Sequence, residues 1–212
     1  KMKYDITLAT SIAPNSRLDV QKDAIESWVN AGFRIVALNE TSEIRELSII
    51  FKNIEFIPQI RTAKAIFGNP YIYISDILAY LKTQDSRIGG IINSDIFLTN
   101  NRDFSSFLIR EFENSLIYGP RIEVKTFESE HGDIDPFGFD YFIFDKNMIM
   151  DWKESRFCIG LPSWDHWFPL VSMFNGRKIK KIISPCPLHI THAVPTNRNV
   201  IPFNIEFLNQ II

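Results

Sequence analysis

The segment Ile88-Gly89-Gly90-Ile91-Ile92-Asn93-Ser94-Asp95 is the most informative part of the chain. Five apolar residues in succession are typical of a strand buried on both faces of a parallel sheet. The polar triplet that follows places a carboxylate, Asp95, at the carboxyl end of this strand. In open α/β sheets, ligands bind in the crevice beyond the carboxyl ends of the strands. The segment therefore predicts an α/β fold with a binding site at Asn93-Ser94-Asp95.

Strand and helix patterns alternate through the first half of the chain. Short apolar runs indicate strands, and apolar residues at three- and four-residue spacing indicate helices. The expected strands are residues 4–10, 33–38, 54–57 (ended by Pro58) and 88–92, and the expected helices are residues 19–30, 43–51, 76–84 and 103–114 (with Asp103 as N-cap). Such alternation is typical of a parallel sheet built from right-handed crossovers.

The pattern changes in the second half of the chain. Strands are expected at residues 115–118, 140–144 and 178–183, and a helix is expected at residues 164–175. Residues 123–138 are polar and contain glycine and proline, and we interpret them as a loop that holds a substrate. No repeat or linker divides the chain, so residues 1–212 are expected to form a single α/β domain. Its mainly parallel central sheet is flanked by helices and is followed by a small antiparallel part.

The composition is that of an ordinary globular protein, and it narrows the range of partners. Hydrophobic residues make up 45% and charged residues 23% of the chain, with a net charge of -2. There is no broad basic field that would capture nucleic acid, and no apolar stretch approaches the roughly 20 residues that span a bilayer. Two cysteines cannot form a disulfide framework, which favours a reducing, cytoplasmic compartment. Because the chain begins Lys1-Met2, we expect it to be a trimmed or excised part of a larger polypeptide.

The exit of the first expected strand excludes two common phosphate-binding motifs. The sequence Thr10-Ser11-Ile12-Ala13-Pro14-Asn15 contains no glycine, so neither the dinucleotide fingerprint nor the P-loop is present. A bound diphosphate must then be neutralised by a metal ion or by basic side chains. Asp95 is suited to a hard divalent cation, and Asn93 offers a weaker oxygen ligand. The alternative is that both residues only cap the turn after the strand.

Polar side chains beyond the second and third expected strands are further candidates. Asn39 follows the second strand and is able to bind a base or a ribose. Arg61 and Lys64 follow the third strand and are able to face a diphosphate, although such residues are more often solvated surface charges. Asp140 opens a later strand and is a candidate for contact with a substrate hydroxyl.

The sequence Trp164-Asp165-His166-Trp167 places an acid between two indoles, where a Gly-Pro turn gives way to a helix. A carboxylate beside aromatic walls is partly desolvated, which raises its pKa and its strength as a base. The flat faces of Trp164 and Trp167 are suited to a sugar or a base. The alternative is that Asp165 is a helix N-cap and that both tryptophans belong to the core.

Two histidines, His189 and His192, follow Cys186 late in the chain. An imidazole here would complete the coordination of a metal ion at Asp95, provided that the sheet brings the two strand ends together. A zinc site made of Cys186, His189 and His192 is a second alternative, but it lacks the usual paired ligand spacing. A third is that the two histidines only satisfy hydrogen bonds in a loop.

Taken together, these features resemble a nucleotide-sugar glycosyltransferase of the GT-A fold. The features that carry the resemblance are, in chain order, the Thr10-Ser11 strand exit, the helix at residues 21–28, residues 32–39, Asn93-Ser94-Asp95, Asp140, Asp165 and His192. In that family an Asp-x-Asp motif after a central strand binds Mn or Mg together with the diphosphate of the nucleotide sugar, and here Asn93 stands in place of the first acid.

The resemblance implies a single GT-A-like, Rossmann-related domain. Residues 1–114 would bind the nucleotide sugar, and residues 115–212 would bind the acceptor. The activity that it implies is metal-dependent transfer of a hexose from a UDP-linked donor to a glycan or glycolipid acceptor. The setting would be bacterial surface polysaccharide synthesis, in the cytoplasm and at the inner membrane face.

The resemblance also implies roles for the candidate residues. Asp95 and His192 would hold the metal ion, with His189 as the substitute ligand, and Asp165 would be the catalytic residue. From the positions and chemistry of the candidates described above, we further expect the donor to contact Thr10, Ser11, Asn39, Arg61, Lys64, Asn93 and Asp95, and the acceptor side to contact Asp140, Trp164 and Trp167. Two other functions stay open. A metal-dependent nucleotidyltransferase or phosphohydrolase would normally need more clustered acids, and a non-catalytic glycan-binding relative is suggested by the missing first acid.

Overall fold

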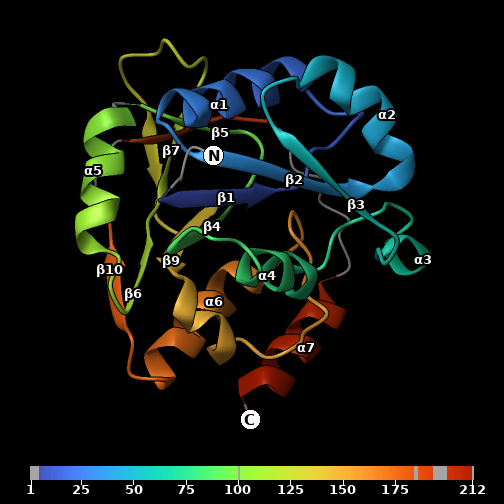
Figure 1. Ribbon diagram of the computed structural model, residues 1–212, viewed down its shortest axis with the longest axis vertical. Helices are drawn as coiled ribbons and strands as arrows, with labels where there is room; N and C mark the ends of the chain where they lie inside the picture. The colour runs from blue at the N-terminus through green and yellow to red at the C-terminus, as the bar shows by residue number, and fades with distance from the viewer. Residues whose placement is uncertain (1–4, 100, 184–185, 193–199, 212) are drawn as a thin grey trace.

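The computed structural model describes residues 5–99, 101–183, 186–192 and 200–211. A seven-stranded sheet forms its centre, in the order β10-β6-β9-β4-β1-β2-β3 (Figure 1). Its strands are β1 (Ile6–Thr10), β2 (Arg34–Glu40), β3 (Glu55–Gln59), β4 (Ile88–Ile92), β6 (Ser115–Tyr118), β9 (Tyr141–Asp145) and β10 (Lys178–Lys181). The strands pair in parallel except for β9, which runs antiparallel to β4 and β6. The mainly parallel α/β sheet predicted from the sequence is therefore confirmed.

Helices cover both faces of this sheet (Figure 1). They are α1 (Leu18–Asn30), α2 (Thr41–Ile50), α3 (Lys64–Phe67), α4 (Ile74–Lys82), α5 (Asn101–Glu111), α6 (Trp164–Phe174) and α7 (Ile201–Ile211), with a 3₁₀ helix, η1, at Lys146–Asp151. One core contains Trp28 of α1 and Leu108 of α5, and the other contains Ile77 of α4 and Phe168 of α6. Ile6 and Leu8 of β1 belong to the first core and Ala9 belongs to the second, because side chains alternate along a strand. In the part of the chain that is described, no helix is both long and apolar enough to cross a membrane.

A second, smaller sheet contains β11, a strand late in the chain. Its order is β5-β11-β7-β8, from the strands β5 (Ile96–Leu98), β7 (Arg121–Val124), β8 (Asp133–Asp135) and β11 (Pro187–Ile190). β11 pairs antiparallel with β5 and parallel with β7, and β7 pairs antiparallel with β8. In this register His189 lies opposite both Ile96 and Glu123. The small sheet therefore brings a histidine from the end of the chain beside the residue that follows Asp95.

The structure corrects several expected boundaries. β3 includes Pro58, because β3 is an edge strand, where a missing backbone N–H is tolerated. α5 begins at Asn101, so Asp103 lies in its first turn and not at the N-cap. Residues 123–138, expected to be a loop, contain β8 and the end of β7. The sequence does not predict α3, β5, β7, β8, η1, β11 or α7, and Tyr4, the expected start of the first strand, lies outside the described residues.

Candidate active site

A cavity of about 650 Å³ opens at the carboxyl ends of β1 and β4. Its lining comes from residues 11–16 after β1, Asn93-Ser94-Asp95 after β4, residues 159–162, 164 and 165 at the start of α6, and the histidines His189 and His192. Asp95, Asp165 and His192, which are far apart in the sequence, therefore meet in one cavity.

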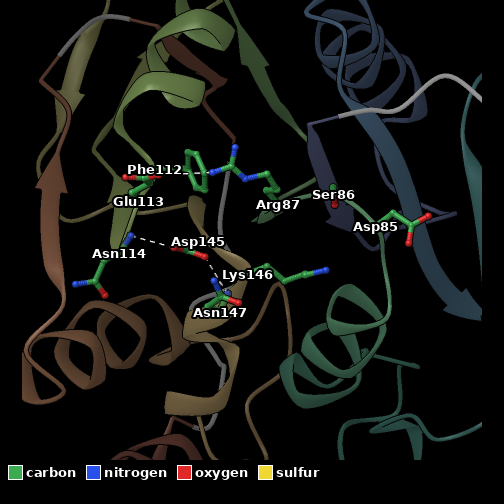
Figure 2. A pocket seen from close by; sticks show the side chains of 9 residues that line it. All are labelled: Asp85, Ser86, Arg87, Phe112, Glu113, Asn114, Asp145, Lys146 and Asn147. Carbon is green, nitrogen blue, oxygen red and sulfur yellow. Dashed lines mark hydrogen bonds and ion pairs between the residues drawn. The ribbon is translucent and has the colours of Figure 1, made fainter.

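A smaller cavity, of about 340 Å³, lies at the opposite end of β4, where β9 ends (Figure 2). Asp145 in its wall accepts hydrogen bonds from the backbone N–H groups of Asn114 and Asn147, both at 3.0 Å. This carboxylate thus stabilises the local backbone. Because open parallel sheets bind ligands at the carboxyl ends of their strands, we assign the candidate site to the larger cavity.

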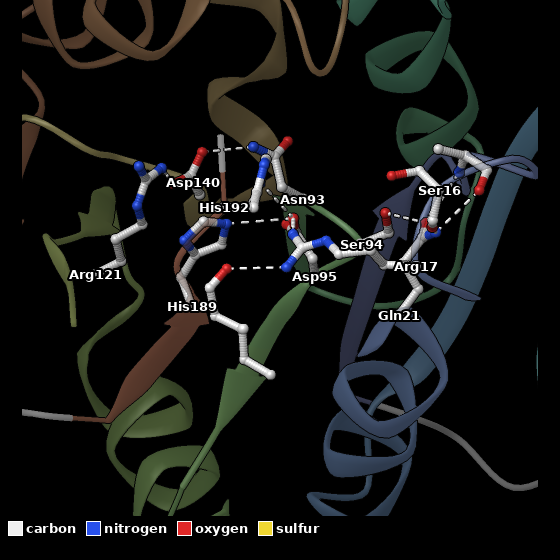
Figure 3. A network of polar contacts seen from close by, with 12 residues as sticks. Ser16, Arg17, Gln21, Asn93, Ser94, Asp95, Arg121, Asp140, His189 and His192 are labelled. Carbon is white, nitrogen blue, oxygen red and sulfur yellow. Dashed lines mark hydrogen bonds and ion pairs between the residues drawn. The ribbon is translucent and has the colours of Figure 1, made fainter. Parts of the chain in front are cut away.

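Asp95 is the centre of a cluster formed by Arg17, His189 and His192 (Figure 3). Its Oδ2 atom lies 3.3 Å from Nε2 of His189 and 3.8 Å from Nε2 of His192. One ligand atom from each of these three residues lies within 4.8 Å of the others. Ligands bound to one ion at bond lengths of about 2.1 Å are separated by about 3 to 4 Å. The distances from Asp95 to the two histidines lie in this range, so the three residues are candidates to hold a single divalent cation.

Glu123 fixes the orientation of His189. The His189 side chain is buried, and its Nδ1 atom lies 3.0 Å from both carboxylate oxygens of Glu123. A carboxylate on one imidazole nitrogen sets the tautomer and directs the other nitrogen toward a metal ion. Sequence reasoning missed Glu123, because its contact with His189 depends on the pairing of β7 with β11.

Arg17 was also missed, and it contacts the same carboxylate. Its Nη2 atom donates to Asp95 Oδ2 at 3.0 Å, and its Nη1 atom donates to the carbonyl oxygen of Ile190 at 2.9 Å. Arg17 has a φ of 39°, in the left-handed region that non-glycine residues rarely adopt. No local sequence pattern predicts this conformation of Arg17 or its contact with Asp95.

The electrostatics of this cluster keep Asp95 ionised. Burial works to raise the pKa of Asp95, but His189, Arg17 and His192 outweigh it, so the pKa lies below its ordinary value. Burial likewise works to lower the pKa of His189, but Asp95 and Glu123 outweigh it and the pKa is raised. An ionised, partly buried carboxylate of this kind attracts a cation.

Asn93 faces a second acid. Its Nδ2 atom donates to Asp140 Oδ1 at 2.5 Å, and Arg121 donates to the other oxygen of Asp140. Arg121 also binds Glu123 at 2.6 Å and Asp135 at 3.1 Å. Burial raises the pKa of Asp140, although Arg121 opposes this. An acid at position 93 would set two carboxylates against each other, so the amide in place of the first acid of the Asp-x-Asp pattern has a structural reason.

Asp165 lies in the first turn of α6 and lines the cavity. Its buried Oδ1 atom has no hydrogen-bond partner among the described residues, and its Oδ2 atom lies 3.9 Å from Nε2 of His166. Burial raises the pKa of Asp165, His166 lowers it, and the charge of Asp140 raises it further, for a net increase. The N-cap position belongs to Ser163, so Asp165 is not the cap.

The two tryptophans have different positions. Trp164 lines the cavity at one edge, although only 2% of its surface is exposed. Trp167 is fully buried and packs against Phe157 and Phe168, so it presents no face to the cavity. Both belong to one hydrophobic core.

Two buried side chains hold the loop between β1 and α1. Asn39 binds both the backbone N–H and the carbonyl oxygen of Ile12, at 3.2 and 2.8 Å. Gln21 binds the backbone of Ala13 in the same two-sided way, at 2.9 Å each, and accepts from the Ser94 hydroxyl at 2.7 Å. Asn39, predicted to touch a ligand, thus shapes the loop that lines the cavity.

The remaining predicted residues divide into two groups. Ser11 lines the cavity, whereas Thr10 is fully buried at the end of β1. Arg61 pairs with Asp76 and Glu154, and Lys64 pairs with Glu40, all outside the cavity lining. Cys186 is buried and donates to the carbonyl oxygen of Thr99 at 3.0 Å, and it is not part of the candidate metal group. These contacts give Arg61, Lys64 and Cys186 structural partners away from the site.

Comparison with known proteins gives similarity in structure alone. No protein-family model matches the sequence, and no curated protein matches it. Among solved structures, HddC from Yersinia pseudotuberculosis is similar with a TM-score of 0.55 and 12% identity, over 98% of this chain and 99% of that one. The mannosyltransferase PcManGT from Pyrobaculum calidifontis, in complex with GDP-Man and Mn²⁺, gives 0.55 and 10%, over 99% and 62%. Residues 1–349 of TarS from S. aureus give 0.53 and 13%, over 88% of this chain, which spans only 60% of that fragment.

These similarities establish the fold. It is an α/β fold shared by GT-A-like glycosyltransferases and by nucleotidyltransferases. The predicted fold family is confirmed at that level. Identities of 10 to 13% do not distinguish between the two classes of enzyme.

Proposed function

We propose that this protein is a metal-dependent glycosyltransferase that moves a hexose from a UDP-linked nucleotide sugar to a hydroxyl of a glycan or glycolipid acceptor. The observation that carries the proposal is the convergence of Asp95, His189, His192 and Asp165 on one cavity at the carboxyl ends of β1 and β4. Proteins of the same fold have been solved with GDP-Man and Mn²⁺ and with UDP-GlcNAc.

Asp95, His189 and His192 would hold the cation. Two imidazoles beside one carboxylate favour Mn²⁺ over Mg²⁺, because Mg²⁺ prefers oxygen ligands. A bound ion would stabilise the charge that develops on the leaving diphosphate. Glu123 keeps the Nε2 atom of His189 directed at this position.

Asp165 would act on the acceptor. Its raised pKa makes it a stronger base than an ordinary aspartate, and its Oδ1 atom is available to receive a proton from the acceptor hydroxyl. In a retaining reaction the same carboxylate would instead stabilise positive charge at the sugar. For an acceptor used in bacterial surface polysaccharide synthesis, this step would take place at the cytoplasmic face of the inner membrane.

Thermal unfolding with UDP, GDP and CDP, each with and without Mn²⁺, tests the donor half of the proposal. UDP at about 100 times its dissociation constant should raise the melting temperature by roughly 5 to 10 °C when Mn²⁺ is present. Asp95→Ala should abolish the Mn²⁺-dependent part of this shift. Asp23→Ala, at an exposed position of α1, is the matched control and should retain it. A full shift in Asp95→Ala would refute the proposed cation site.

A nucleotidyltransferase is the second candidate, and one observation favours it. HddC and the 4-diphosphocytidyl-2C-methyl-D-erythritol synthase from Anaerococcus prevotii match this chain over 98% of its length and over 99% and 96% of their own. Incubation with a nucleoside triphosphate and a sugar phosphate would release pyrophosphate if this activity is present. Release of UDP from a UDP-sugar with an acceptor supports glycosyl transfer instead, and sugar binding without UDP release indicates a non-catalytic relative.

A further inference from the structure

Arg17 binds the carboxylate oxygen that the proposed cation needs. Asp95 Oδ2 accepts from Arg17 at 3.0 Å and also faces His189 at 3.3 Å and His192 at 3.8 Å (Figure 3). The guanidinium is held in this position by a second bond, to the carbonyl oxygen of Ile190 on β11. A positive group therefore already lies where the carboxylate would meet a metal ion.

The guanidinium and a divalent cation cannot both bind this oxygen at full strength. Two positive charges within a few ångströms of each other repel in a partly buried site. Binding of the cation to Asp95 and the two imidazoles would therefore release the Nη2 donor of Arg17.

A released Arg17 would lie next to an anionic ligand. It directly follows residues 11–16, which line the cavity, and its planar fork is suited to two phosphate oxygens at once. Arg121, the arginine in the described lining, is already bound by Glu123, Asp135 and Asp140. A cation that binds Asp95 would therefore displace Arg17 and leave its guanidinium without this carboxylate partner.

We infer that Arg17 occupies the cation position at Asp95 until substrate binds, and that it then exchanges this carboxylate for the diphosphate of the nucleotide sugar. The inference rests on the proposed function and adds to it a residue that links binding of the cation to binding of the donor. Arg17 is a binding residue in this scheme, and the exchange makes and breaks hydrogen bonds only.

Removal of Arg17 should therefore have two effects of opposite sign. In Arg17→Ala, affinity for Mn²⁺ alone should rise about tenfold, because Asp95 no longer has to give up a charged hydrogen bond. Affinity for UDP at saturating Mn²⁺ should fall about tenfold, because the diphosphate loses the same kind of bond. Electron paramagnetic resonance of free Mn²⁺ measures the first, and titration calorimetry with UDP measures the second.

Two further variants separate direct competition from the general effect of charge. Lys22→Ala removes a positive charge at an exposed position of the same helix and should change neither affinity. Arg17→Lys keeps the charge but cannot bind Asp95 and Ile190 through one planar fork, so its affinities should move toward those of Arg17→Ala. Urea unfolding of each variant verifies that the fold is intact.

Several outcomes would overturn the inference. One is an Arg17→Ala variant in which both affinities fall or neither changes, and another is an Arg17→Lys variant that matches the wild type. If the wild type binds Mn²⁺ and only these comparisons fail, the proposed function stands without this role for Arg17. If neither the wild type nor Arg17→Ala binds Mn²⁺, both the metal site and the inference are wrong.

Discussion

The cavity contains two aspartates in opposite environments. Asp95, after β4, is surrounded by Arg17, His189 and His192, and its pKa lies below the ordinary value. Asp165, at the start of α6, faces a neighbouring histidine at 3.9 Å and has one buried oxygen without a partner among the described residues, and its pKa is raised.

The difference indicates a division of chemical roles. When two acids in one site have pKa values shifted apart, the acid with the lower value stays ionised, and the other is suited to proton transfer. Each environment is built by a different part of the fold. The small sheet brings His189 to Asp95 and Ile190 to Arg17, whereas Asp165 follows Trp164, a residue of the core that contains α4 and α6.

The substitution Asp165→Asn should have the largest effect, because it removes the proposed catalytic base. Loss of a general base lowers turnover by about 10² to 10⁴-fold, so sugar transfer should fall within this range. The Mn²⁺-dependent thermal shift with UDP should be unchanged, because Asp95 and its partners are intact. Steady-state transfer assays on wild type and variant measure the effect, with Asp23→Ala as the control. Turnover equal to wild type would exclude the assigned role of Asp165.

The substitution Glu123→Gln should weaken metal binding at Asp95, His189 and His192, by a smaller factor. An amide holds the Nδ1 atom of His189 less strongly than a carboxylate, and loss of such a supporting group costs about 10 to 100-fold in metal affinity. We expect the lower part of this range, measured by calorimetry with Mn²⁺. Glu128→Gln, at an exposed position of the same segment, should bind Mn²⁺ like the wild type. Equal affinity in Glu123→Gln and the wild type would show that His189 does not need its carboxylate partner to bind the ion.

The central sheet was predictable because its signals are local. Apolar runs and helical spacing identified β1, β2 and β4 and the helices α1, α2 and α4 to within about three residues. Short strands gave no such signal: β5 has three residues and β11 has four, one of them a proline. Both exist because each pairs with a strand far away in the sequence, and a local pattern does not encode this pairing.

The candidate site was predictable in its chemistry more than in its contacts. The strand-end rule identified Asp95, and the flanking indoles identified Asp165 as an acid in an apolar setting. Glu123 and Arg17 were not predicted, because nothing in the sequence distinguishes them from an ordinary surface glutamate and an ordinary surface arginine. The sequence also predicted a ligand-binding face for Trp167, but the core buries this side chain completely.

The smallest expected effect is the pH dependence of the stability of Asp165→Asn and Asp95→Asn. Because the pKa of Asp165 is raised in the folded state, the wild type loses stability as pH rises from the ordinary value of 3.8 through the raised one. Asp165→Asn removes this loss, so its free energy of unfolding relative to wild type should rise between pH 4 and pH 7, by about 1 kcal/mol. Asp95 has a lowered pKa and contributes stability above 3.8 that is lost as pH falls through its folded-state value, so Asp95→Asn should lose stability at pH 7. Urea unfolding without metal at both pH values measures each difference, and changes of the same sign in the two variants would mean that the two aspartates do not differ as described.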